Sequence, residues 1–112
     1  MIRFRIGFFR YIIMNELKVS EDTLSFIKAL ASEPRMKILL LFTDGQERTV
    51  NEIKDAIEFS QSTTSEHLAL MKRAGILTSN KQGKEVYYQP DRTKILYFLE
   101  TISSVLRNCC PL

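Results

Sequence analysis

Two short helical patterns separated by a three-residue break constrain the fold of this chain more than any other feature. The segment "TVNEIKDAI" carries apolar residues at three- and four-residue spacing, which is typical of an amphipathic helix that begins near Thr49. After the break "EFS", the segment "QSTTSEHLALMKRAG" predicts a second helix that ends at Gly75, with Leu68 and Met71 facing inward. Two short helices joined by a tight turn predict a helix-turn-helix.

A two-stranded hairpin is predicted directly after the second helix. The segments "ILTSN" and "EVYYQ" are rich in β-prone residues, and the polar "KQGK" between them holds a glycine suited to a turn. Lys81 and Lys84 lie at the expected tip. A hairpin that follows a helix-turn-helix indicates a winged helix-turn-helix.

Three further helical patterns flank this unit. Residues 21–31 begin with two acidic residues, which favour the start of a helix. Ser32 is expected to cap the apolar run 35–42, which should be the most buried helix, and Asp91 is expected to cap a last helix over residues 92–110. The predicted fold is therefore mainly α with a small β-hairpin (α+β), a winged helix-turn-helix with the element order α-α-α-α-β-β-α.

We expect one domain with an N-terminal extension. A chain of 112 residues with 45% hydrophobic and 26% charged residues fits a single globular domain. In residues 1–13 arginines interrupt a short apolar run, which is unlike a signal peptide or a membrane-spanning helix. The extension 1–13 is either an arm on the domain or lies upstream of a native start at Met14, so the domain should comprise residues 14–112. No membrane partner is predicted.

Four segments together resemble the ArsR/SmtB family of small winged-helix repressors. They occur in order and in spacing between Phe26 and Gln89, and they read "LASEPRMKIL", "VNEIKDAI", "SQSTTSEHL" and "GKEVYYQ". The two adjacent cysteines, Cys109 and Cys110, are unlike the spaced disulfide framework of a secreted domain and fit a reducing cytoplasm. The resemblance implies a transcriptional regulator, a repressor, that binds double-stranded DNA at an inverted repeat. It also implies a homodimer in which the first and last helices of the two subunits pack together.

The amino end of the second helix is the expected DNA-reading surface. Its free N–H groups and positive dipole end attract phosphate, and small polar side chains allow close approach to a major groove. Ser60 or Gln61 should cap this helix, and the formal charge of +3 favours a polyanionic partner. The residues predicted to contact DNA are Gln61, Ser62, Thr63, Ser65, Glu66, His67, Lys72, Arg73, Lys81 and Lys84.

Some of these residues have simpler interpretations. His67, which we expect on the outward face of the helix, can be a solvated surface histidine, and the four basic residues can be ordinary surface charges. Glu66 is repelled by phosphate unless it is paired. We expect it either to accept a hydrogen bond from cytosine N4 or to pair with a nearby lysine.

The metal sites of the resembled family are not carried over. Arsenic- and cadmium-type sensors have a cysteine pair where this chain reads "ERTVNEI", and zinc-type sensors have a histidine where this chain has Thr93, two residues after Asp91. We therefore predict no metal and no cofactor. Cys109 and Cys110 are the remaining candidates for sensing, since neighbouring thiolates can bind a thiophilic ion or be oxidised, but they can also be an incidental tail.

A rival interpretation is a winged-helix module that binds a protein partner without specific DNA binding, because fold alone does not determine function. The polar start of the second helix and the lysines of the hairpin argue against it. Enzymatic activity is not predicted, since no nucleophile–base pair, phosphate-cradling glycine loop or carboxylate pair is evident.

Overall fold

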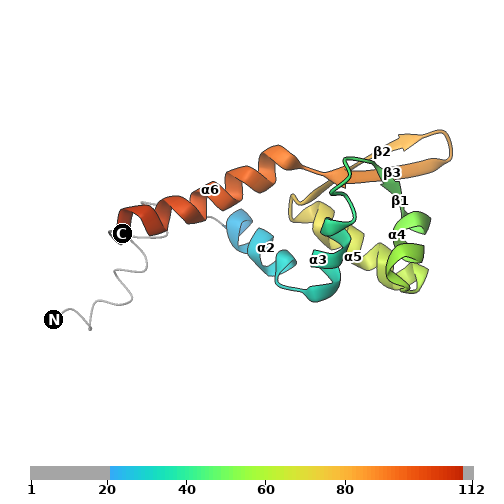
Figure 1. Cartoon of the computed structure of the whole chain (residues 1–112), viewed down its shortest axis with the longest axis horizontal. Helices are drawn as coiled ribbons and strands as arrows, with labels where there is room; N and C mark the ends of the chain where they lie inside the picture. The colour runs from blue at the N-terminus through green and yellow to red at the C-terminus, as the bar shows by residue number, and fades with distance from the viewer. Residues whose placement is uncertain (1–20, 110–112) are drawn as a thin grey trace.

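The computed structural model describes residues 21–109, whose element order is that of a winged helix-turn-helix (Figure 1). The predicted extension 1–13, Met14 and Cys110 lie outside the described residues. The predicted fold class is confirmed. The elements are α2 (Glu21–Leu30), α3 (Glu33–Leu40), β1 (Arg48–Thr49), α4 (Val50–Ile57), α5 (Gln61–Arg73), β2 (Leu77–Gln82), β3 (Glu85–Pro90) and α6 (Arg92–Cys109).

Local hydrogen bonds define the helix-turn-helix formed by α4 and α5. Thr49 caps α4 with a capping box, because its hydroxyl accepts from Glu52 N at 3.2 Å and its own N–H donates to the Glu52 carboxylate at 2.8 Å. Glu58 ends α4 in the left-handed conformation (φ 57°), and Ser60 then caps α5. Gly75 follows α5 at φ +84°, as the sequence predicts.

The sheet is antiparallel, with the strand order β1-β3-β2. β2 and β3 form the predicted hairpin, which we call the wing, and Gln82 pairs with Glu85 across its turn. The strand β1 was not predicted. It has two residues, Arg48 and Thr49, paired with Tyr88 and Tyr87 of β3, and a pair of residues is too short to show an alternating pattern.

The core lies where α5 packs against the other helices and the base of the wing. α5 contributes Leu68 and Met71, both with no exposed surface, and Thr64, whose buried hydroxyl donates to Ser60 O at 2.9 Å. This inward face of α5 was predicted and is confirmed. The buried apolar residues are Phe26, Ala29, Ile38, Phe42, Ile53, Leu68, Met71, Ala74, Ile76, Leu77 and Phe98.

The expectation that the run 35–42 forms the most buried helix is wrong. Ile38 is the only buried residue within α3, whereas Met36 is 39% exposed and Leu40 is 57% exposed. An eight-residue helix that is apolar on most sides meets the core of its own chain along one edge. Its other sides are left uncovered in the single chain.

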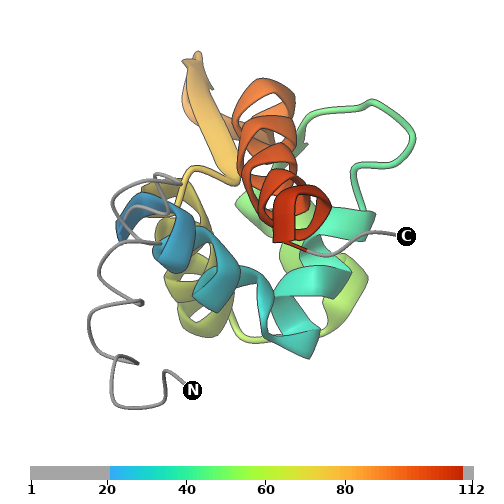
Figure 2. The same ribbon diagram turned by 90° about the vertical axis from the view of Figure 1, so that its left-hand side faces the viewer.

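α6 extends away from the wing, with α2 beside it (Figures 1 and 2). The ring of Phe98 lies against that of Phe26 on α2, with 4.7 Å between the centroids. Asp91 caps α6 as predicted, since its carboxylate accepts from Lys94 N at 3.1 Å. Among the described residues, no helix has the length and apolar character that crossing a membrane requires.

Candidate nucleic-acid interface

Four polar side chains form an exposed patch at the amino end of α5. They make no hydrogen bond or ion pair within residues 21–109, and their three- and four-residue spacing puts them on one side of the helix. We call them the α5 patch: Gln61, Ser62, Ser65 and Glu66. The patch contains one amide, two hydroxyls and one carboxylate. All four groups can hydrogen-bond to bases, and the amide and the hydroxyls can also hydrogen-bond to phosphates.

Thr63 is at the same end of α5, but its hydroxyl is already engaged. Ser60 Oγ donates to Thr63 Oγ1 at 2.9 Å and accepts from Thr63 N at 3.1 Å. Ser60 therefore fills the capping role that the sequence left open between Ser60 and Gln61. The Gln61 side chain is consequently left for other contacts.

The wing lies at the same end of the molecule as α4 and the start of α5, opposite the end of α6 (Figure 1). Lys81 and Lys84 are exposed near its tip. A residue that was not predicted from the sequence holds one side of the wing. Glu47, in the loop before β1, accepts from Asn80 Nδ2 and from Gln82 Nε2, both at 3.1 Å.

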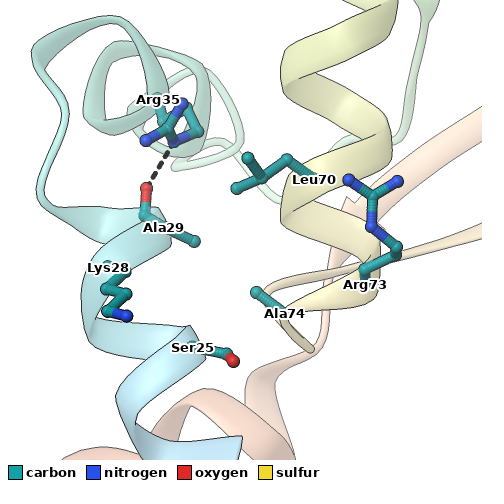
Figure 3. Close-up of a pocket in the computed structure, with 7 residues that line it drawn as sticks. All are labelled: Ser25, Lys28, Ala29, Arg35, Leu70, Arg73 and Ala74. Carbon is teal, nitrogen blue, oxygen red and sulfur yellow. Dashed lines mark hydrogen bonds between the residues drawn. The ribbon is translucent and has the colours of Figure 1, made fainter.

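Lys72 and Arg73 lie at the other end of α5, away from the α5 patch. Lys72 Nζ donates to Ser79 Oγ on β2 at 2.7 Å, so its side chain ties α5 to the base of the wing. Arg73 is exposed and lines a cavity beside α2 (Figure 3). The structure therefore does not bring these two residues together with the six that lie in the α5 patch and at the wing tip.

His67 does not lie on the outward face of α5, which corrects the sequence-based expectation. It is half-buried, and Arg35 Nη1 of α3 donates to its Nδ1 at 3.2 Å. The ring of Phe59 lies 5.8 Å from the imidazole, between centroids. The sequence does contain a pattern that indicates this orientation, because His67 is next to the buried residues Thr64, Leu68 and Met71 on the helix.

Burial and Arg35 both disfavour a charge on His67. Burial lowers its pKa, the nearby guanidinium lowers it further, and Glu66 acts in the opposite direction. Because a guanidinium can only donate, Nδ1 of His67 is an acceptor and the ring is neutral with its proton on Nε2. Arg35 is itself held by a hydrogen bond from its Nε to Ala29 O at 2.6 Å.

Glu66 forms no ion pair with a lysine in the part of the chain that the structure describes. The alternative in which a nearby lysine neutralises it is therefore not realised in the structure. Its carboxylate is exposed within the α5 patch.

No group of three or more potential metal ligands occurs within residues 21–109. Thr93 and Asp91 are both at the start of α6, where Asp91 caps the helix. Cys109, the last residue of α6, is exposed and disulfide-bonded in this structure. The sensing role considered for Cys109 and Cys110 stays a prediction.

The comparison with known proteins agrees with this geometry. A model of the family described as "Bacterial regulatory protein, arsR family" matches residues 32–79. The transcriptional activator HlyU of Vibrio cholerae is 33% identical over 85 residues, which cover 76% of this chain and 78% of HlyU. The chain belongs to the ArsR family of bacterial regulatory proteins. The resemblance seen in the sequence is confirmed.

The chain is also similar to a regulator named for cadmium resistance. The cadmium resistance transcriptional regulatory protein CadC of Listeria innocua is 40% identical over 75 residues, 67% of this chain and 63% of CadC. The match thus spans less than two thirds of CadC, and nothing about cadmium is carried over.

Solved structures of the family have the same fold. Reduced HlyU from Vibrio cholerae aligns with a TM-score of 0.63 at 31% identity, covering 88% of this chain and 99% of HlyU. The homodimeric winged helix-turn-helix domain of Mb0332 from Mycobacterium bovis aligns with a TM-score of 0.64 at 24% identity, covering 81% and 83% of the two chains, which shows the fold alone. The chain is a winged helix-turn-helix transcriptional regulator.

Proposed function

We propose that this protein is a sequence-specific DNA-binding repressor that acts as a homodimer on an inverted-repeat operator. The observation that carries the proposal is the α5 patch, whose side chains are exposed and without partners among the described residues. A recognition helix that enters a major groove by its amino end needs such side chains at its first two turns. Gln61 suits adenine, and Ser62 and Ser65 suit either bases or phosphates.

Lys81 and Lys84 supply the phosphate contacts of the proposed complex. Both are exposed at the tip of the wing, and the wing lies at the same end of the molecule as the start of α5 (Figure 1). Lysines that neutralise phosphates add affinity without sequence preference, and they make binding depend on salt. Thr63, His67, Lys72 and Arg73 have indirect roles in this proposal, because their side chains are engaged or lie away from the α5 patch.

The exposed apolar residues of the helices support the homodimer. Large apolar side chains are exposed mainly on α2, α3 and α6, and a second subunit would remove them from water. Such a dimer presents two α5 helices to successive major grooves, with half-sites roughly 34–36 Å apart. The residues concerned are Leu24, Ile27, Met36, Leu40, Leu96, Tyr97, Leu99 and Leu106.

Repression is the simplest regulatory outcome for a protein with these two surfaces. Occupying an operator that overlaps a promoter is sufficient to repress transcription. The relative HlyU is called an activator, so the direction of regulation needs its own measurement. Transcription in vitro from the protein's own promoter should fall as the protein is added, and a rise would contradict the assignment as a repressor.

The test of DNA binding is fluorescence anisotropy of the reduced protein on DNA from its own upstream region and on scrambled DNA of equal length. We expect binding of a dimer that is at least a thousandfold tighter to the upstream DNA, as true operators allow. Equal and salt-limited binding to both DNAs would favour the protein-interaction module instead. Blocking the thiols in the same assay tests Cys109 and Cys110, and loss of binding would identify them as the sensor.

The salt dependence separates the wing from the α5 patch. Replacing Lys81 or Lys84 by glutamine should make the negative slope of log affinity against log salt shallower by about 1 each and should affect all DNA sequences equally. Arg107→Gln is a control that removes the same charge, because Arg107 lies in the last turn of α6, opposite the wing (Figure 1), and pairs with Glu100 at 2.6 Å. A wing variant with an unchanged slope would mean that the wing does not contact phosphate.

A further inference from the structure

The outer half of the wing, residues 80–86, has few contacts that hold it in place. Every residue in this range is exposed, and none belongs to the buried core. β1 pairs with Tyr88 and Tyr87, nearer the base, so beyond them the wing is a two-stranded ribbon. An isolated two-stranded hairpin is at best marginally stable in water. The outer half therefore needs other contacts if its lysines are to keep a fixed position.

Glu47 supplies such contacts from the loop before β1. Its Oε1 accepts from Asn80 Nδ2 and its Oε2 accepts from Gln82 Nε2, both at 3.1 Å. Gln82 Nε2 also donates to Asn80 Oδ1 at 2.9 Å, so the three side chains form one network. Within residues 21–109, no other side-chain hydrogen bond joins residues 80–86 to a segment outside the hairpin. The charge on the acceptor makes these bonds stronger than bonds between neutral groups.

The network lies on one face of the wing, and Lys81 lies on the other. Successive side chains of a strand point to opposite faces of a sheet, so Lys81, between the two amides, is on the opposite face from them. Ser79 shares the face of Lys81, and Lys72 of α5 donates to its hydroxyl at 2.7 Å. β2 is thus held from both faces, by Glu47 on one and by α5 on the other.

We propose that Glu47 is a positioning residue for DNA binding, which holds the outer wing so that Lys81 and Lys84 reach the phosphates of the operator. Glu47 makes no DNA contact of its own in this proposal, since phosphate repels a carboxylate. It orders the wing before DNA binds, so that less conformational freedom is lost on binding. The inference rests on the proposed function, because that function assigns the phosphate contacts to the wing.

The charge of Glu47 and its positioning role have opposite effects on affinity. If charge alone matters, removing a carboxylate near phosphates strengthens binding to all DNA. If the wing must be held, removing the acceptor of Asn80 and Gln82 weakens binding. Glu85 separates the two effects. It is an exposed carboxylate on the same wing, and its side chain makes no hydrogen bond or ion pair with any described residue.

The first test is fluorescence anisotropy on the upstream DNA at about 0.15 M salt. Glu47→Ala should lower the affinity about three- to tenfold, which is part of the loss expected when two phosphate contacts are removed. The matched control Glu85→Ala should raise it. Glu47→Gln keeps one acceptor oxygen, so its affinity should lie between those of Glu47→Ala and the wild type. Lys84→Gln should cost less affinity in the Glu47→Ala background than alone, because a wing that is not held contributes less phosphate contact.

The second test measures the order of the wing in the same variants without DNA. The heteronuclear NOE of backbone amides reports motion on the picosecond-to-nanosecond timescale. We expect the values for residues 80–86 to fall in Glu47→Ala and to stay unchanged in Glu85→Ala. An unchanged spectrum of the α5 amides verifies that each variant is folded.

Two results would overturn the inference. Equal or tighter operator binding by Glu47→Ala would mean that the carboxylate acts only through its charge. Unchanged NOE values in Glu47→Ala would mean that the wing is held without it. A wild type with no preference for the upstream DNA would instead overturn the proposed function, and the NOE values would still decide whether Glu47 holds the wing.

Discussion

Arg35 and His67 form the one side-chain hydrogen bond between α3 and α5 in the part of the chain described, and it depends on a neutral imidazole. Protonating His67 puts two positive charges 3.2 Å apart at a half-buried position and removes the acceptor of the Arg35 N–H. The protein is therefore expected to resist this protonation, which is the physical meaning of the lowered pKa.

The lowered pKa of His67 predicts a loss of stability in mild acid. A histidine whose folded pKa is below its unfolded value of about 6.5 contributes stability that is fully present above that pH. The contribution falls as pH decreases toward the folded pKa, because the unfolded chain binds the proton first. Urea unfolding should therefore give a lower free energy of unfolding at pH 5.5 than at pH 7.5, by at most about 1.4 kcal/mol for each pH unit.

His67→Gln is the control for this measurement, and the chain contains no other histidine. The variant should lose less stability than the wild type between the same two pH values, because other titrating groups are common to both. An identical pH dependence of the two proteins would contradict the linkage.

Glu66 is predicted to read a cytosine. Its carboxylate is exposed in the α5 patch and has no lysine partner among the described residues, so next to DNA it is repelled unless cytosine N4 donates to it. Glu66→Gln should then lose about 1–3 kcal/mol of discrimination at one base pair of each half-site. Competition assays with operators substituted at each position measure this loss. Uniformly tighter binding to every DNA would mean that the carboxylate only repels phosphate.

At the scale of elements, Gly75 lies in the connection between α5 and β2 and against α6. Its φ is +84°, and a Cβ there would lie 3.3 Å from Cε2 of Phe98 and 3.3 Å from Cδ of Lys94. Lys94 can move aside, but Phe98 is buried and packed against Phe26. Gly75 therefore has two roles: it ends α5, and its lack of a side chain lets α6 pack close to it.

Gly75→Ala should destabilise the protein more than Gly83→Ala. Both positions have positive φ, which costs a non-glycine residue about 1–2 kcal/mol. Gly83 has nothing within 4 Å of the added methyl group, whereas Gly75 must also displace the Phe98 ring, which costs about 1–3 kcal/mol more. Urea unfolding of the two variants measures the difference. Equal losses would show that Phe98 moves without cost.

At the scale of the whole molecule, the exposed faces of α2, α3 and α6 are the feature that a single chain does not explain. Leu99 is 46% exposed and Leu106 is 60% exposed on α6, while Leu24 and Ile27 are each 39% exposed on α2. Burial of such side chains contributes about 25 cal/mol for each Å² of apolar surface removed from water. In a homodimer with twofold symmetry each contact occurs twice, so a small apolar surface on each subunit can stabilise the dimer.

Leu99→Glu tests this surface. We expect the dimer dissociation constant to rise by more than 100-fold, because about 1.5–3 kcal/mol of apolar burial is lost in each subunit and a charge is placed on the apolar face of α6. Sedimentation equilibrium measures the change. Val86→Glu is the control, since Val86 is also exposed, at 36%, but lies on the wing. Equal dissociation in both variants, or in neither, would exclude α6 from the dimer interface.

The predicted element order was correct apart from β1, because it depends on signals between close neighbours. The hydrogen bonds that cap α4, α5 and α6 each join residues three apart, so the start of each of these helices can be predicted from the sequence. The pairs are Thr49 and Glu52, Ser60 and Thr63, and Asp91 and Lys94. Helical periodicity also identified the buried face of α5 through Leu68 and Met71.

Contacts between distant residues had no such signal. His67 turns toward Arg35, 32 residues away, and Glu47 holds Asn80 and Gln82 across 33 and 35 residues. The sequence by itself therefore determined the helices, the two strands of the wing and where they begin, since short-range hydrogen bonds and periodicity specify both. Only the tertiary structure decided which way His67 points, how little of α3 is buried and that β1 pairs with the wing, because these depend on packing between segments far apart in the chain.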